Sequence, residues 1–106
     1  MKRKTVACPV EEAAYVLNNP WKILIVRELC NGPRRFGELR TSVNNISPRV
    51  LSGSLRDMED NGLLTKKIYA EVPPHTEYAL TSLGQGLITI VNELARWGLK
   101  YQEADL

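Results

Sequence analysis

The spacing of apolar residues changes twice along this chain, and these changes limit the folds that it can adopt. Over residues 10–58 apolar side chains recur at helical intervals. Over residues 64–80 they alternate, which is the period of β-strands. Over residues 81–101 the helical interval returns, and Thr81 is expected to cap this last helix. We therefore expect a set of helices, then one β-hairpin, then a long final helix.

Proline, asparagine and glycine divide the first part of the chain into four helices. Proline suits the first position of a helix, so helices are expected to begin at Cys8-Pro9, at Pro20 after an asparagine cap at Asn19 and, after a serine cap, at Ser47-Pro48. Asn31-Gly32-Pro33 ends the second helix and Asn61-Gly62 ends the fourth, because glycine and then proline commonly follow a helix. A short third helix fits between the second and the fourth.

The expected hairpin has strands over residues 64–69 and 76–80. The loop between them, Ala70–His75, contains two prolines and is too long for a two-residue turn, so it should protrude. A short helix, a tight turn, a longer helix and a hairpin together form a winged helix-turn-helix. The chain is predicted to be one DNA-binding domain over residues 1–106, mainly α with a small β-hairpin (α+β), with dimerisation helices at both ends.

The fourth helix presents a basic and polar side opposite its apolar stripe. Arginine makes bidentate hydrogen bonds to guanine edges, serine suits bases or phosphates, and Gly53 would let the backbone approach DNA closely. The alternative is an ordinary solvated helix face, because arginine is common on protein surfaces. The predicted reading residues are Ser47, Pro48, Arg49, Ser52, Gly53 and Arg56.

Basic residues also gather on both sides of this helix in the sequence. Residues 34–67 contain seven basic and four acidic side chains, a net charge of +3, whereas the whole chain carries +2. Arginines at the start of the third helix and lysines beside the hairpin loop can hold phosphates. For the single histidine, a plain surface position is the commoner case. The predicted phosphate contacts to double-stranded DNA are Arg34, Arg35, Lys66, Lys67 and His75.

The last helix has more apolar surface than a core of this size can cover, and the first helix has an apolar stripe of its own. We therefore expect a two-fold homodimer built from these two helices, which places the two fourth helices about 34 Å apart on one side of the duplex. Alternatively, the same residues complete the core of a monomer. The predicted interface residues are Val10, Ala14, Ile88, Ala95, Trp97 and Leu99.

Several classes of protein are not expected. One histidine and two well-separated cysteines supply neither a nucleophile with a base nor a metal cluster, so no enzyme, metal or cofactor is expected. No run of about 18 apolar residues occurs, so a cytoplasmic protein without a membrane partner is expected. Two rival functions are a winged helix that binds only proteins and a DNA binder that senses a small ligand between its helices.

Several motifs follow one another in a specific order: Cys8-Pro9-Val10, Trp21-Lys22, Gly32–Leu39, Ile46–Leu51, Glu71–Pro74 with Glu77-Tyr78, and Leu80–Gly84. In this respect the chain resembles the HxlR-type regulators, prokaryotic relatives of the MarR-like winged-helix proteins. The resemblance implies a homodimer that binds a pseudo-palindromic operator and represses or activates nearby genes. Of the two actions, repression is the one expected here.

The resemblance also implies that a cysteine at the position of Cys8 can sense oxidants or electrophiles. Cys8 lies at an expected helix start and close to the basic residues Lys2, Arg3 and Lys4, an environment that favours reactive thiols. The alternative is an inert, half-buried cysteine, which is the commoner case, and Cys30 is interpreted in that way. Because no cysteine stands near the C-terminus, the disulfide partner of Cys8 is left open.

Overall fold

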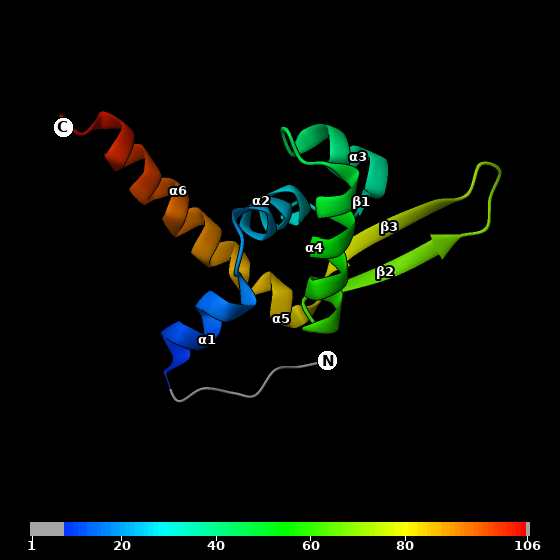
Figure 1. Cartoon of the computed structure of the whole chain (residues 1–106), viewed down its shortest axis with the longest axis horizontal. Coiled ribbons are helices and arrows are strands. Elements are labelled where there is room, and N and C mark those ends of the chain that lie inside the picture. The colour runs from blue at the N-terminus through cyan, green and yellow to red at the C-terminus, as the bar shows by residue number, and fades with distance from the viewer. Residues whose placement is uncertain (1–7, 106) are drawn as a thin grey trace.

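The computed structural model describes residues 8–105 of the chain. Within this range, the elements are α1 (Pro9–Val16), α2 (Pro20–Leu29), β1 (Arg34–Arg35), α3 (Phe36–Ser42), α4 (Pro48–Asp60), β2 (Leu64–Tyr69), β3 (His75–Leu80), α5 (Ser82–Gln85) and α6 (Leu87–Glu103). They surround one apolar core, and α6 and the β2–β3 hairpin project from opposite ends of the molecule (Figure 1). The predicted order of helices, hairpin and final helix is confirmed.

Helix α2 lies at the centre of the core. Its Ile25, Val26 and Leu29 are buried, and the helix packs against α3, α4, α6 and β3. Asn19 caps its start, as predicted, because the side-chain oxygen accepts a hydrogen bond from the Lys22 N–H at 3.1 Å. The other buried apolar side chains of the core are Leu39, Val43, Ile46, Leu51, Leu55, Met58, Leu63, Leu64 and Tyr78.

The sheet has three strands in the order β1–β3–β2, one more than the expected hairpin. Arg34 and Arg35, expected at the start of the third helix, instead form β1 and pair with Tyr78 and Glu77 of β3. The Glu38 carboxylate accepts a hydrogen bond from the Arg35 N–H at 2.8 Å, so α3 begins only after this arginine. Both arginines are therefore in extended backbone, where they can add a strand to the hairpin.

The long final helix predicted over residues 81–101 is divided in two, with Gly86 between α5 and α6. Thr81 caps α5 as predicted: its hydroxyl accepts a hydrogen bond from the Gly84 N–H at 3.0 Å and donates one to the Gly62 carbonyl at 2.6 Å. Gly84 packs directly on Leu63, where a Cβ would lie 2.2 Å from the carbonyl oxygen. Helix α5 is thus fixed to the turn before β2, whereas α6 packs against α2, and the helix is interrupted between these two attachments.

Helices α1 and α6 carry much apolar surface that the rest of the chain leaves uncovered. No residue of either helix is buried. Leu87 and Val91 of α6 pack partly against the core, but the C-terminal half of the helix extends away from it (Figure 1). Despite this apolar surface, no helix within residues 8–105 is long and apolar enough to cross a membrane.

Two glycines should respond in opposite ways to replacement by alanine. Gly84→Ala forces a Cβ against the Leu63 backbone and should lower the free energy of unfolding by about 1–3 kcal/mol. Gly53→Ala, inside α4, meets no atom within 4 Å and should raise it by about 0.5–1 kcal/mol, because alanine favours a helix. Urea denaturation of the two variants measures both effects. Equal stabilities would contradict the close packing of α5 on Leu63.

Candidate nucleic-acid interface

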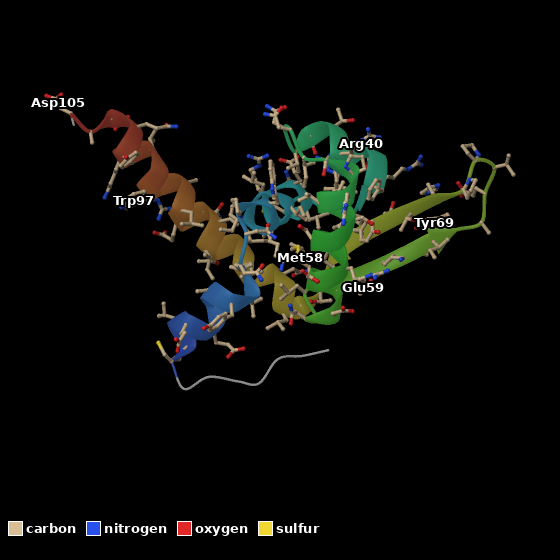
Figure 2. All side chains as sticks on the ribbon, viewed as in Figure 1. Arg40, Met58, Glu59, Tyr69, Trp97 and Asp105 are labelled. Carbon is tan, nitrogen blue, oxygen red and sulfur yellow. The ribbon has the colours of Figure 1, made fainter. Side chains whose placement is uncertain are left out.

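Helix α4 presents one side to the core and the other to solvent. Ser47 Oγ caps its start by accepting a hydrogen bond from the Val50 N–H at 3.1 Å. The predicted apolar stripe of Leu51, Leu55 and Met58 is buried, and Figure 2 shows Met58 on the core side of the helix. The positions predicted to read bases are all exposed: Ser47, Pro48, Arg49, Ser52, Gly53 and Arg56.

Lys22, a buried lysine of α2, connects that helix to α4. The lysine is only 2% exposed, and its Nζ donates to Asn18 Oδ1 at 2.9 Å and lies 3.4 Å from Asp57 Oδ2 of α4. A buried ammonium group needs such partners, because its desolvation would otherwise be very costly. Sequence reasoning did not find this role, although a single cation within the apolar run from Trp21 to Val26 was a signal for it.

Tyr78 of β3 is a buried tyrosine that senses the charge of α4. Burial of this side chain raises the pKa of its hydroxyl above the ordinary value, and the negative charge of Glu59 on α4 raises the pKa further. Both effects disfavour the phenolate. Tyr78 therefore keeps a neutral hydroxyl in the neighbourhood of the Glu59 carboxylate of α4.

The basic residues predicted to hold phosphates differ in their exposure. Arg34 is half-buried because it pairs with the buried Tyr78. Its neighbour Arg35 lies opposite Glu77 in the strand register, and both side chains are on the other face of the sheet. His75 begins β3 rather than lying in the loop, and its side chain is only 16% exposed. The exposed members of the set are Arg35, Lys66 and Lys67.

The outer part of the hairpin holds a cluster of polar side chains around Tyr69. The Tyr69 ring stacks on the His75 ring with centroids 4.6 Å apart, and Lys67 Nζ lies 4.9 Å from the Tyr69 centroid. The Tyr69 hydroxyl donates to Glu77 Oε1 at 3.2 Å, and His75 Nδ1 lies 3.4 Å from Glu71 Oε1. Figure 2 shows Tyr69 on β2, away from the core. His75 is thus a packed residue, and sequence reasoning missed Tyr69 because its contacts depend on strand register.

A surface groove runs between the start of α3 and this hairpin. Arg35, Phe36 and Gly37 line it from one side, and Pro74 and His75 line it from the other. The groove therefore joins β1 to the outer end of the hairpin, and two of the predicted phosphate contacts, Arg35 and His75, line it.

The two cysteines have different environments. Cys8 is exposed and stands immediately before α1, without a side-chain hydrogen bond to the helix start. This exposure disagrees with the alternative of a half-buried cysteine. Cys30 is partly buried and its thiol donates to the Val26 carbonyl at 3.3 Å, as expected of a packing residue. The basic residues 2–4, which were expected to affect Cys8, lie outside the described part of the chain.

Most residues predicted at a dimer interface are uncovered in the single chain. Trp97 is 62% exposed and stacks on Tyr101 with ring centroids 5.4 Å apart, on the projecting half of α6 (Figure 2). Ile88 differs, because it is half-buried and lines a groove with Leu29 and Leu80. The alternative that the whole set completes the monomer core is therefore wrong for the exposed residues, which are Val10, Ala14, Ala95, Trp97 and Leu99.

Comparisons with known proteins agree with this arrangement. The model of the HxlR-like helix-turn-helix family matches residues 16–106. The HTH-type transcriptional regulator YkvN of Bacillus subtilis (strain 168), described as uncharacterized, is 39% identical over 102 residues, which cover 96% of this chain and 86% of YkvN. These matches confirm the resemblance to HxlR-type regulators, and such relatives are transcriptional regulators rather than enzymes.

Two solved structures show the same fold. A Porphyromonas gingivalis W83 protein described as a MarR-family transcriptional regulator superposes with a TM-score of 0.86 at 34% identity, covering 93% of this chain and 97% of that one. The redox regulator HypR in its oxidized form superposes with a TM-score of 0.82 at 34% identity, covering 93% of this chain and all (100%) of HypR. The winged helix-turn-helix prediction is thereby confirmed, and the chain belongs to the HxlR-like helix-turn-helix family of transcriptional regulators.

Proposed function

We propose that this chain is a sequence-specific DNA-binding repressor that binds an inverted-repeat operator as a homodimer. The observation that carries the proposal is the exposed side of α4, where Arg49, Ser52, Gly53 and Arg56 lie on a helix whose opposite side is buried. In the major groove such a helix presents two guanidinium groups to guanine edges. Membership in a family of helix-turn-helix regulators supports the same function.

Gly53 supports a close approach of DNA to α4. A glycine inside a helix costs about 0.5–1 kcal/mol relative to alanine, and among residues 8–105 no atom beyond the neighbouring backbone of α4 itself lies within 4 Å of the position that its Cβ would take. Packing within the chain therefore gives no reason for glycine here, whereas a nucleic acid against the helix does. On this proposal the stabilised Gly53→Ala variant binds its operator less tightly than the wild type.

The rival function, a winged helix that contacts only proteins, fits this surface less well. The centres of protein interfaces are depleted in charged residues other than arginine and enriched in aromatic ones. The exposed side of α4 has no aromatic residue, and beside its two arginines it carries a serine and a glycine. Lys66 and Lys67 of β2, the strand that contacts α4, are exposed as well.

The homodimer is proposed from the uncovered surface of α1 and α6. Large exposed apolar side chains that gather on one element mark an interaction site, and on α6 these include Leu94, Trp97 and Leu99. A second copy of the chain is the occupant that we propose. A two-fold pair brings both α4 helices to one side of a duplex, which binding to an inverted repeat requires.

The assignment of roles predicts two kinds of DNA-binding defect. Arg49→Ala or Arg56→Ala should cost about 1–3 kcal/mol of operator affinity and relax base preference at one position per half-site. Lys67→Ala or Arg35→Ala should weaken binding to all sequences and make it less sensitive to salt. Selection of bound duplexes from a random pool measures both effects. Recovery of no inverted repeat by the wild type, or identical profiles for Arg49→Ala and Lys67→Ala, would refute these roles.

The dimer is tested by sedimentation. The chain has a mass of 12.0 kDa, so the wild type should sediment at about twice this mass at micromolar concentration. Leu99→Glu places a charge in the proposed interface and should give the monomer. Ile68→Glu is the matched control, because Ile68 is equally apolar and 68% exposed but lies on the hairpin. A wild-type monomer, or dissociation by both variants, would count against the interface.

A second candidate function is regulation through the thiol of Cys8. This thiol is exposed beside a helix of the proposed dimer interface, and the similar protein HypR is described as a redox regulator. Oxidation or alkylation there would place new bulk or charge next to α1. Within α1 no residue is buried and only Val16, at its end, packs partly against the core, so the part of the helix next to Cys8 can move without disrupting the core. The spacing of the two α4 helices would change with this movement.

Thiol regulation predicts that diamide or a quinone lowers operator affinity of the wild type and not of Cys8→Ser. Cys30→Ser is the control for the other thiol and should respond like the wild type. Affinity is measured before and after treatment, with modification of Cys8 checked by mass spectrometry. Unchanged affinity after complete modification of Cys8 would leave a regulator that does not use this thiol.

A further inference from the structure

Glu77 lies between two of the predicted phosphate-binding residues. In the register of the sheet it is opposite Arg35 of β1 and also opposite Lys67 of β2. Opposed residues of antiparallel strands share one face and have Cβ atoms about 4.5–5.5 Å apart. A carboxylate at this position is within reach of both cations. An ion pair with either one would compete with a DNA phosphate for the same charge.

Tyr69 gives the carboxylate a different partner. The Tyr69 hydroxyl donates a hydrogen bond to Glu77 Oε1 at 3.2 Å, and Lys67 Nζ lies 4.9 Å from the centroid of the Tyr69 ring. Among residues 8–105, neither Arg35 nor Lys67 forms an ion pair. Glu77 is thus bound by a neutral donor, and both cations stay available to a ligand.

The Tyr69 ring is itself fixed at this position. It stacks on the ring of His75, its partner in the opposite strand, with an interplanar angle of 16°. His75 is in turn 3.4 Å from the Glu71 carboxylate through Nδ1. A ring held on one face and partly buried keeps its hydroxyl directed at Glu77 before DNA arrives, so little conformational freedom is lost on binding.

We propose that Tyr69 is a positioning residue for contacts to the DNA backbone. Its hydroxyl holds the Glu77 carboxylate away from Arg35 and Lys67, and its ring face carries the Lys67 ammonium group. This inference rests on the DNA binding proposed above. Without the hydroxyl, Glu77 pairs with Lys67 or Arg35, and that ion pair has to break before the cation can bind a phosphate.

The test compares the wild type with Tyr69→Phe, Glu77→Gln and the double variant. Tyr69→Phe removes only the hydroxyl and keeps the ring beside Lys67 and His75. Fluorescence anisotropy measures affinity for the selected operator and for a random-sequence duplex at about 50–200 mM salt. Tyr69→Phe should weaken both complexes about threefold to tenfold at low salt and reduce the salt slope by about one, the loss of one phosphate contact. Glu77→Gln alone keeps the wild-type slope, and the double variant regains it.

Tyr101→Phe is the matched control, because it removes the hydroxyl of an exposed tyrosine on α6 but keeps the ring that stacks on Trp97, and it should leave the slope unchanged. Two results overturn the inference. One is unchanged binding by Tyr69→Phe. The other is that Tyr69→Phe lowers DNA affinity equally in the wild type and in the Glu77→Gln background. That result would mean that the hydroxyl contacts DNA itself. If the wild type binds neither duplex, the proposed function fails, and this inference fails with it.

Discussion

A buried ammonium group joins the two helices on which the interface depends. Lys22 of α2 is only 2% exposed, and its Nζ reaches both Asn18 and Asp57, the latter on α4. Because a buried charge must keep its partners, Asp57 has to face α2. This requirement and the buried apolar stripe of α4 together fix the rotation of the helix about its own axis. The side that carries Arg49 and Arg56 is consequently turned outward.

Helix α2 also connects the apolar surface of α6 to the helix-turn-helix. It packs against α6 on one side and against α4 on another, and its Ile25, Val26 and Leu29 are almost fully buried. A close-packed core transmits displacement as movement of a whole unit rather than as local deformation. In the proposed dimer, the position of α6 at the interface therefore determines, through α2, the position of the α4 helix in each subunit.

The parts of the fold that follow from local chemistry could be predicted from the sequence. The caps Asn19, Ser47 and Thr81 and the apolar stripe of α4 depend only on neighbouring residues, so their spacing was sufficient. The strand of Arg34 and Arg35 was not predictable in this way. Two residues show no period, and their pairing partners lie more than 40 residues later in the chain. The same holds for Lys22 with Asp57 and for Tyr69 with Glu77, because tertiary packing in one case and strand register in the other bring them together.

The break at Gly86 shows why the last helix should be considered as two functional parts. Gly84 fixes α5 to Leu63 beside the hairpin, so α5 belongs to the helix-turn-helix and its sheet. Helix α6, by contrast, packs on α2 and has no buried residue of its own. In the proposed dimer, a change at α1 or α6 can therefore alter the relation between the two subunits without loosening α5, the sheet or α4. Any regulation acting through α1 would accordingly change the distance between the two α4 helices and leave the reading surface of each one intact.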